Sequence, residues 1–192
     1  MAVSLKLTVT SPCSVYPPHS HAAVEDAFHN REHATALSLL TRAIGLDPHN
    51  SQYFVKRADA YLHLGDPSSA TTNLQHALTL LPPGTCKDAI LQQLSLALYL
   101  NGEALFREGM PHLALEKFRS LCALDPSCLV PRLKCMACLH SLGQHGKCLC
   151  EVEAALQQHP GNTDLFAVRA RVHWELGKVS YMLTIEFKQQ MS

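Results

Sequence analysis

Small and large apolar residues alternate along the chain at intervals of three or four, which places side chains on one face of an α-helix. In residues 51–84 two such runs follow each other, separated by the turn sequence Gly65-Asp66-Pro67. Because glycine can end a helix and proline can open one, the pattern predicts two helices joined by a tight turn. The two runs are Phe54, Ala58 and Tyr61, then Ala70, Leu74 and Ala77.

The same pattern returns further along the chain. Each second run is followed by a proline, in the phrases LDPHN, LTLLPPG, LDPSC and QHPGN, and these prolines lie 34, 44 and 34 residues apart. Turn sequences also recur, at 109–111 and 143–145. Chance periodicity would not also place the turn glycines, so we predict a tandem array of helical hairpins. In residues 95–128 the small and large positions of this pattern hold Leu98, Gly102, Leu105, Ala114 and Phe118. Leu121 stands where a small residue is usual.

The 34-residue period and the order of small and large positions resemble the tetratricopeptide repeat (TPR) family over residues 24–177. The resemblance is weakest in the first unit, where Val24 and Ala27 stand in exchanged positions. It implies an all-α fold of tandem TPR hairpins stacked in a right-handed superhelix, an α-solenoid. The implied organisation is a flexible leader 1–16, a TPR array 17–177 with units 17–50, 51–84, 95–128 and 129–162 and a half unit 163–177, an insertion 85–94, and a divergent tail 178–192.

Three segments, LHLGDPSSATTNLQHAL, LALYLNGEALF and CMACLHSLGQH, resemble the N-terminal part of one member of this family. We therefore expect the chain to be a fragment or short form of a longer array. The insertion has a physical interpretation of its own. Thr85 and Asp88 have the spacing of a capping box, and apolar residues continue from Ile90 into the next unit at helical spacing. This predicts one long helix from about residue 86 to 108, roughly 35 Å.

Composition narrows the classes of function. Sixteen basic and sixteen acidic residues among 192 give a net charge of zero, whereas nucleic acids and anionic membranes attract clustered basic side chains. We expect neither partner. No apolar run has the length of a membrane span, and polar residues interrupt the N-terminal MAVSLKLTVTSPC, unlike a secretory signal. The expected localisation is cytoplasmic, where the eight cysteines stay reduced.

The segment CMACLHSLGQHGKCLC, residues 135–150, contains enough cysteine and histidine donors for a tetrahedral zinc site. In the repeat frame, however, Cys135 and Cys148 occupy packing positions, and free cysteine is among the most buried side chains. We interpret these residues as packing and predict no metal. A metal or redox module formed by Cys135, Cys138, Cys148 and Cys150 is the alternative. No catalytic or nucleotide-binding motif is found, so we predict neither an enzyme nor a cofactor.

The resemblance also implies where a partner binds. In this family the second, fifth, ninth, twelfth and thirteenth residues of each unit line the concave groove, although some instead pack between repeats. These positions hold Gln52, Val55, Asp59, Leu62 and His63; Leu96, Tyr99, Glu103, Phe106 and Arg107; Val130, Leu133, Ala137, His140 and Ser141; and Asp164, Ala167, Arg171, Trp174 and Glu175. The predicted binding residues among them are Asp59, Leu62, Tyr99, Glu103, Phe106, Arg107, His140, Arg171 and Trp174.

Co-chaperones of the family clamp a C-terminal carboxylate with Lys and Asn at the fifth and ninth positions of a unit. Here those positions hold Val55 and Asp59 in one unit and Tyr99 and Glu103 in another. We therefore expect no such clamp. The sequence as a whole predicts a non-enzymatic scaffold that binds an unidentified protein or peptide in its concave groove.

Overall fold

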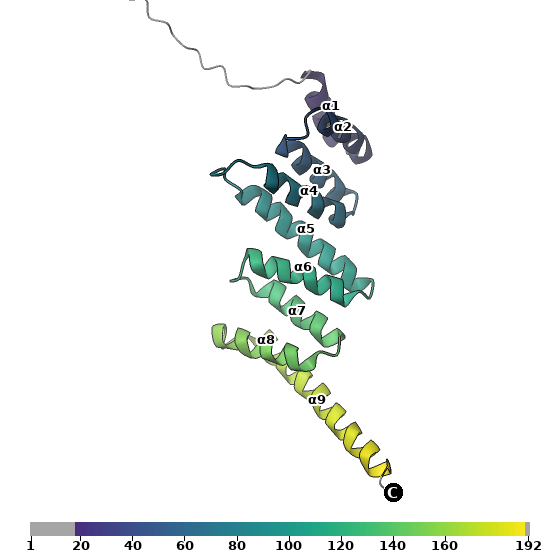
Figure 1. The fold of residues 1–192 in the computed structure, drawn as a ribbon, viewed down its shortest axis with the longest axis vertical. Coiled ribbons are helices and arrows are strands. Elements are labelled where there is room, and N and C mark those ends of the chain that lie inside the picture. The colour runs from purple at the N-terminus through teal and green to yellow at the C-terminus, as the bar shows by residue number, and fades with distance from the viewer. Residues whose placement is uncertain (1–17, 191–192) are drawn as a thin grey trace, which may run out of the picture.

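In the computed structural model the chain is an all-α stack of helical hairpins (Figure 1). The structure describes the backbone of residues 18–190 and the side chains of residues 22–177, so the predicted leader 1–16 lies outside the described residues. Within this range there are helices and no strands. The helices are α1 (Pro18–His29), α2 (His33–Leu46), α3 (Ser51–His63), α4 (Pro67–Leu80), α5 (Asp88–Arg107), α6 (Pro111–Leu124), α7 (Leu129–Ser141), α8 (His145–Gln158) and α9 (Thr163–Gln190).

The helices stack in chain order. Each packs mainly on the helix before it and the helix after it, and α7 in addition contacts α9. Figure 1 shows the resulting ladder, with the C-terminal half of α9 projecting beyond the last hairpin. In a stack of this kind each unit is stabilised by its immediate neighbours, and folding can propagate from one hairpin to the next. Among the described helices none is long and apolar enough to span a membrane.

The tight turns inside the four hairpins share one pattern of backbone hydrogen bonds. In the α3–α4 turn the amides of Leu64, Gly65 and Asp66 donate to the carbonyls of Ala60, Leu62 and Tyr61. The turns after α1, α5 and α7 repeat these three hydrogen bonds at equivalent positions. The middle residue must take a positive φ, and glycine supplies it three times, with φ between 68° and 77°. Pro67 and Pro111 then open α4 and α6, as the sequence predicted.

Short polar segments connect one hairpin to the next. They include the phrases LDPHN and LDPSC and the connection that contains Asn162. The Asp47 carboxylate accepts a hydrogen bond from the amide of His49, and Asp125 accepts one from Ser127. Asn50 and Asn162 then accept hydrogen bonds from the first amides of α3 and α9. Such turns and caps satisfy backbone donors at helix starts, which gives a physical reason for the recurrence of these phrases.

Small residues let paired helices approach closely in the core. Gly102 of α5 lies against Phe118 of α6, and a Cβ built on Gly102 would come within 2.8 Å of the Phe118 ring. Ala58, Ala70 and Leu74 are almost fully buried between α3 and α4. Most residues of the small–large pattern are therefore core residues, whereas Tyr61 and Leu105 are partly buried and pack against the core. One continuous apolar cluster extends from α3 to α9.

The first hairpin has a separate, smaller core. Val24, Leu40, Ala43 and Tyr53 form a second buried cluster that joins α1 and α2 to α3. Both residues that depart from the repeat pattern, Val24 and Ala27, are buried, with exposed fractions of 4% and 3%. The exchanged sizes are thus accommodated by local packing, which explains why the sequence signal is weak here although the hairpin forms.

Two expectations about helix ends need correction. α5 begins at Asp88, its N-cap residue is Lys87, and no side chain caps it. The capping box predicted from Thr85 is therefore wrong, and Cys86 instead donates a thiol hydrogen bond to the Asp88 carboxylate. In addition, α9 does not end near Gly177 but continues to Gln190. The backbone of the divergent tail is helical up to that residue.

The Gly102–Phe118 contact generates a stability prediction. Helix propensity alone favours alanine over glycine by about 1 kcal/mol. We nevertheless expect Gly102→Ala to destabilise the protein by about 1–3 kcal/mol, because the new methyl group overpacks against the Phe118 ring. The matched control is Gly45→Ala in α2, which has open space around the added Cβ and should be neutral or stabilising. Urea unfolding compares the two variants, and equal effects would contradict this packing analysis.

A second prediction concerns Arg31, which takes the glycine position of the α1–α2 turn with a φ of 59°. A left-handed conformation is costly for a residue with a side chain, and this cost exceeds the extra flexibility that glycine gives the unfolded chain. Arg31→Gly should therefore stabilise the protein by about 0.5–1 kcal/mol. Arg42→Gly, in the regular part of α2, should destabilise it. Denaturation midpoints measure both, and a loss of stability in Arg31→Gly would refute the strain argument.

Candidate functional site

A pocket of about 250 Å³ lies between the first helices of successive hairpins. It is formed by the end of α5, the part of α7 from its middle to its C-terminal end, and the second and third turns of α9. We call it the α5–α7–α9 pocket. Its lining residues are Phe106, Leu133, Met136, Ala137, His140, Ser141, Val168 and Arg171. The walls are mostly apolar, and three residues supply polar groups.

The polar groups of the pocket have free hydrogen-bonding capacity. The Nε2 atom of His140 is buried yet has no hydrogen-bond partner among the described residues. Its ring packs edge-on against His145, with 5.3 Å between centroids. Arg171 is exposed, and no ion pair or hydrogen bond joins its side chain to the described part of the chain. The pocket therefore combines an apolar interior with one unpaired positive charge at its edge.

The structure brings three of the nine predicted binding residues together in this pocket, namely Phe106, His140 and Arg171. Three further groove positions, Leu133, Ala137 and Ser141, also line it. These six residues come from three helices, and residues on different helices are 27 or more positions apart along the chain. A role in binding remains a prediction, but their convergence on one cavity is a property of the fold.

Tyr99 and Glu103 lie instead in a contact between α5 and α7. The Nζ atom of Lys134 is 2.8 Å from the Glu103 carboxylate and 5.7 Å from the centre of the Tyr99 ring. The nearby carboxylate raises the pKa of Lys134. Tyr99 also packs edge-on against Phe118. These two residues are thus already engaged within the protein, and replacing them would disturb the stack as well as the groove.

The other predicted residues do not line the pocket. Asp59 lies 3.8 Å from His63 on α3, and Leu62 packs against the main core cluster. Arg107 is exposed, and its Nε atom donates to the carbonyl of Glu103. Trp174 is 66% exposed on α9, one turn beyond Arg171.

Two pocket residues were missed by the sequence analysis. Met136 is fully buried in the core, and it also forms part of the pocket lining. Val168 does not occupy one of the family's groove positions. It precedes Arg171 by three residues, so helical spacing places both on one side of α9. That spacing is the signal that could have identified Val168.

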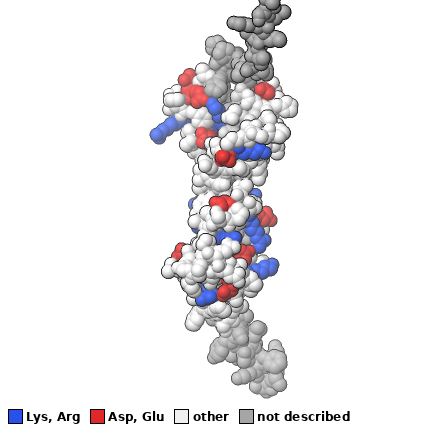
Figure 2. All heavy atoms as spheres, turned by 90° about the vertical axis from the view of Figure 1, so that its left-hand side faces the viewer, with Lys and Arg blue, Asp and Glu red and all other residues white. Residues whose placement is uncertain are grey.

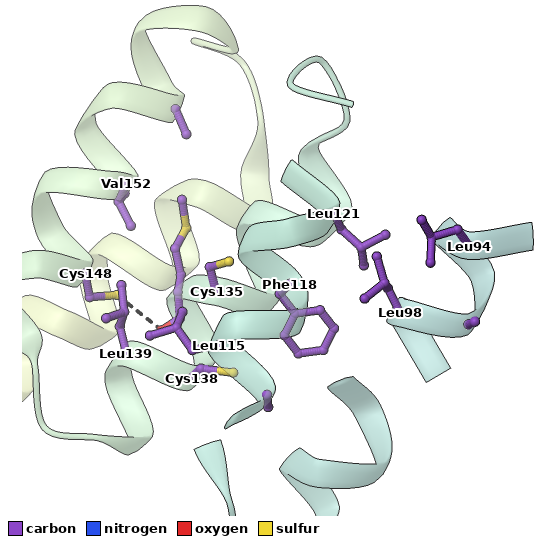
Figure 3. Packing of buried hydrophobic residues seen from close by; sticks show 14 of the residues in the cluster. Leu94, Leu98, Leu115, Phe118, Leu121, Cys135, Cys138, Leu139, Cys148 and Val152 are labelled. Atoms are coloured by element: carbon purple, nitrogen blue, oxygen red, sulfur yellow. Dashed lines mark hydrogen bonds between the residues drawn. The ribbon is translucent and has the colours of Figure 1, made fainter. Parts of the chain in front are cut away.

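The cysteines of residues 135–150 do not form a common site. Cys135, Cys138 and Cys148 are buried, whereas Cys150 is exposed. Figure 3 shows Cys135 and Cys138 among Phe118, Leu115 and Leu139, with Cys148 on the neighbouring helix. The Cys148 thiol donates a hydrogen bond of 3.4 Å to the carbonyl of Met136. Each buried thiol thus fills a place in the helix packing.

Burial also determines the chemistry of these thiols. Desolvation raises the pKa of Cys138 to about 11, and it raises the pKa of Cys135 and Cys148 as well. A thiolate is the form that binds metals and attacks electrophiles, so the buried thiols are poor ligands and poor nucleophiles. Within the side chains that the structure describes, no group of three or more His, Cys, Asp or Glu residues could hold a metal ion.

Charged side chains are dispersed over the surface. On the face shown in Figure 2, acidic and basic residues alternate with uncharged areas, and neither sign forms a continuous patch. Several are paired between helices, including Arg119 with Glu151 and Arg169 with Glu153. These exposed pairs contribute little to stability.

Comparison of the amino-acid sequence with those of known proteins identifies relatives of this chain. No family model matches the chain. Tetratricopeptide repeat protein 16 of Homo sapiens is 40% identical over 139 residues, which are 72% of this chain and 16% of that protein. The protein of the same name from Mus musculus is 34% identical over 133 residues, 69% of this chain and 17% of that protein. The chain thus spans about a sixth of the length of these relatives.

Comparison with solved structures gives the fold. The chain is similar to the crystal structure of MamA protein, with a TM-score of 0.52 and 18% identity, covering 83% of this chain and 81% of that one. It is also similar to a chain of Naa15/Naa10 bound to HypK-THB, with a TM-score of 0.56 and 16% identity, covering 82% and 24%. The fold is that of TPR solenoids. Together, the sequence relatives and the stacked hairpins show that this chain belongs to the tetratricopeptide repeat family.

Proposed function

We propose that the chain is a non-enzymatic scaffold that binds a segment of another protein in the α5–α7–α9 pocket. The observation that supports this most strongly is the convergence of apolar walls, the buried His140 Nε2 atom and the unpaired Arg171 on one cavity. The relatives and the fold are those of the TPR family, whose members act as scaffolds for protein interactions.

The size of the pocket favours a side chain over a small-molecule substrate. Its volume of about 250 Å³ is below the range of about 300–1,000 Å³ for pockets that enclose drug-sized ligands. A cavity of this size suits one large apolar side chain of a bound peptide. Phe106, Leu133 and Val168 provide apolar contacts for it, and buried side chains of this kind are the anchors of many interfaces.

The charge of the pocket favours an acidic segment. Arg171 is the cation of the lining, and a carboxylate on the bound segment would give it a charge-assisted hydrogen bond. A polar group of the ligand could form a hydrogen bond with the buried His140 Nε2 atom at the same time. The preferred ligand therefore carries a large apolar residue with Asp or Glu close to it. The fifth and ninth positions in α7 are Leu133 and Ala137, so the carboxylate clamp of the co-chaperones plays no part in this proposal.

A cysteine-based metal or redox function has less support. Cys150 is exposed, the other three cysteines are buried, and their raised pKa values keep them protonated at neutral pH. We therefore propose that the cysteines are structural and that the chain needs no cofactor. A cytoplasmic location, absence of nucleic-acid binding and absence of a chaperone clamp remain predictions of the sequence.

The pocket can be tested with randomised peptides displayed on phage and selected on the whole chain. We expect the selected peptides to share one large apolar residue with an acidic neighbour. Ala137→Glu should weaken their binding at least tenfold, because its side chain would occupy the pocket and its carboxylate would compete with the acidic residue of the peptide for Arg171. The matched control is Ala123→Glu, which adds the same charge at an exposed position of α6 and should bind normally. Emission of Trp174, the single tryptophan, reports binding nearby.

The charge preference has a sharper test. Arg171→Glu should reverse the selection from acidic to basic peptides, because it exchanges the sign of the charge at the pocket edge. Circular dichroism verifies that each variant keeps its helices. Peptides without an acidic preference, or binding that Ala137→Glu leaves intact, would contradict the proposed site.

The structural role of the cysteines gives a separate prediction. After dialysis the purified chain should contain no stoichiometric zinc in elemental analysis. At pH 8, Cys86 and Cys150 should react promptly with a disulfide reagent, whereas the three buried thiols should react only on unfolding, because they are protonated and inaccessible. One zinc ion per chain, lost in Cys138→Ser but retained in Cys150→Ser, would overturn the packing interpretation.

A further inference from the structure

Two imidazole rings meet at one end of the α5–α7–α9 pocket. His140 lies in the last turn of α7 and lines the pocket, whereas His145 is the first residue of α8, across the tight turn. Their ring centres are 5.3 Å apart. Each ring has one nitrogen, Nε2 of His140 and Nδ1 of His145, that is buried without a hydrogen-bond partner among the described residues. A buried nitrogen of this kind costs free energy, so packing alone does not account for the pair.

The stack does not need imidazoles at these two places. In the α3–α4 hairpin the equivalent places hold Leu62 and Pro67. In the α5–α6 hairpin they hold Phe106 and Pro111. All three turns nevertheless have the same backbone hydrogen bonds. The imidazole pair is therefore a property of the α7–α8 hairpin, and its position at the pocket indicates a role there.

The two rings differ in how well they accommodate a positive charge. His140 lies at the C-terminal end of α7, where backbone carbonyl groups carry partial negative charge that stabilises a cation. His145 lies at the N-terminal end of α8, where backbone amides carry partial positive charge that destabilises a cation. When the pair binds one proton, we therefore expect that proton on His140.

The lining of the pocket supplies no counter-ion for a charged His140. The charged and titratable groups on the neighbouring turns are Glu103 and Arg107 on α5, Lys134 and Cys138 on α7, His145 and Lys147 on α8, and Arg171, His173 and Glu175 on α9. Of these, Arg171 alone also belongs to the lining. The Glu103 carboxylate already pairs with Lys134. A proton on His140 therefore adds a second positive charge to a lining that contains no carboxylate among its described residues.

We propose that the pocket takes up one proton on His140 when it binds an acidic segment, so that its affinity for such segments increases as the pH falls below neutral. Because the carboxylate comes from the ligand, this coupling rests on the proposed function. The proton comes from solvent and adds to the ring nitrogen that is unprotonated in the neutral imidazole. The ligand carboxylate then lies between two cations of the lining, His140 and Arg171. An imidazolium spreads its charge over the whole ring, so the carboxylate needs no contact with the buried Nε2 atom.

The direction of the pH dependence follows from these charges. A bound carboxylate stabilises the charged imidazole, so the complex holds the proton more tightly than the free chain does. Binding is then tighter at low pH, and the gain is lost as the pH rises through the range in which imidazoles lose their proton, about 5 to 8. Asp and Glu of the ligand stay ionised in this range. Uptake of one proton can change the affinity by at most about tenfold per pH unit.

The probe is a peptide selected from a histidine-free random library displayed on phage. The whole chain is panned in parallel at pH 6 and at pH 8, and the most enriched sequence is synthesised with a fluorescent label. We expect its dissociation constant, measured by anisotropy at constant ionic strength, to be at least fivefold lower at pH 6 than at pH 8. Calorimetry in two buffers with different ionisation enthalpies should show uptake of up to one proton per bound peptide.

Three variants of the whole chain locate the proton. His140→Gln retains a side chain that can form hydrogen bonds but cannot titrate, so the pH dependence should disappear. His145→Phe retains an aromatic ring beside His140, so the pH dependence should remain. His112→Gln, at an exposed position of α6, is the matched control and should leave the affinity unchanged at both pH values. Circular dichroism verifies that each variant keeps its helices.

The outcomes separate the proton coupling from the function on which it rests. Peptide binding that does not depend on pH, or a pH dependence that His140→Gln retains, would overturn the coupling and leave the pocket as the binding site. A pH dependence that His145→Phe abolishes and His140→Gln retains would assign the proton to the other ring, which also contradicts the proposal. Absence of enriched peptides at both pH values would instead contradict the proposed function, and the proton coupling with it.

Discussion

The contact between a small residue on one helix and a large residue on its partner is the interaction on which this structure depends. At Gly102 the Phe118 ring occupies the space where a methyl group would otherwise stand, and Ala58, Ala70 and Leu74 form the corresponding tight contact between α3 and α4. Burial of apolar surface between helices needs such close approach, because poorly filled gaps lose dispersion contacts. The turn hydrogen bonds and the polar caps then fix where each helix of a pair begins and ends.

A stack built from these contacts leaves two kinds of unused surface. The first helices of successive hairpins lie next to one another without interlocking as the pairs do, and the α5–α7–α9 pocket forms between them. On α9, Phe166 and Trp174 are 41% and 66% exposed. Both surfaces follow from the one-dimensional arrangement, in which each helix packs mainly on the helix before it and the helix after it. Function in such a protein therefore depends on side chains that packing does not use.

The same principle explains the cysteines. Cys148 stands where α4 has Ala70 and α6 has Ala114, a position that accepts only a small side chain. Cysteine fits because it is small and apolar, and burial keeps its thiol protonated. The cysteine and histidine residues of segment 135–150 are as closely spaced in the sequence as the ligands of a metal site. In the structure, however, Cys150 is exposed, whereas the other three thiols are buried. Metal ligation needs side chains that converge on one point, which sequence spacing alone does not ensure.

The sequence alone determined the hairpin array, because a face repeated at helical spacing and a glycine that must take a positive φ, as at Gly109, depend only on local geometry. It located small and large packing positions for the same reason, including Gly102 and Phe118, and the structure shows that these two residues pack against each other. It did not decide which groove positions form a cavity: Tyr99 and Glu103 are engaged by Lys134, which is remote in sequence. Nor did it show that α9 continues beyond Gly177. Those features depend on how whole helices are placed against one another, and that placement is decided only by the packing of the complete stack.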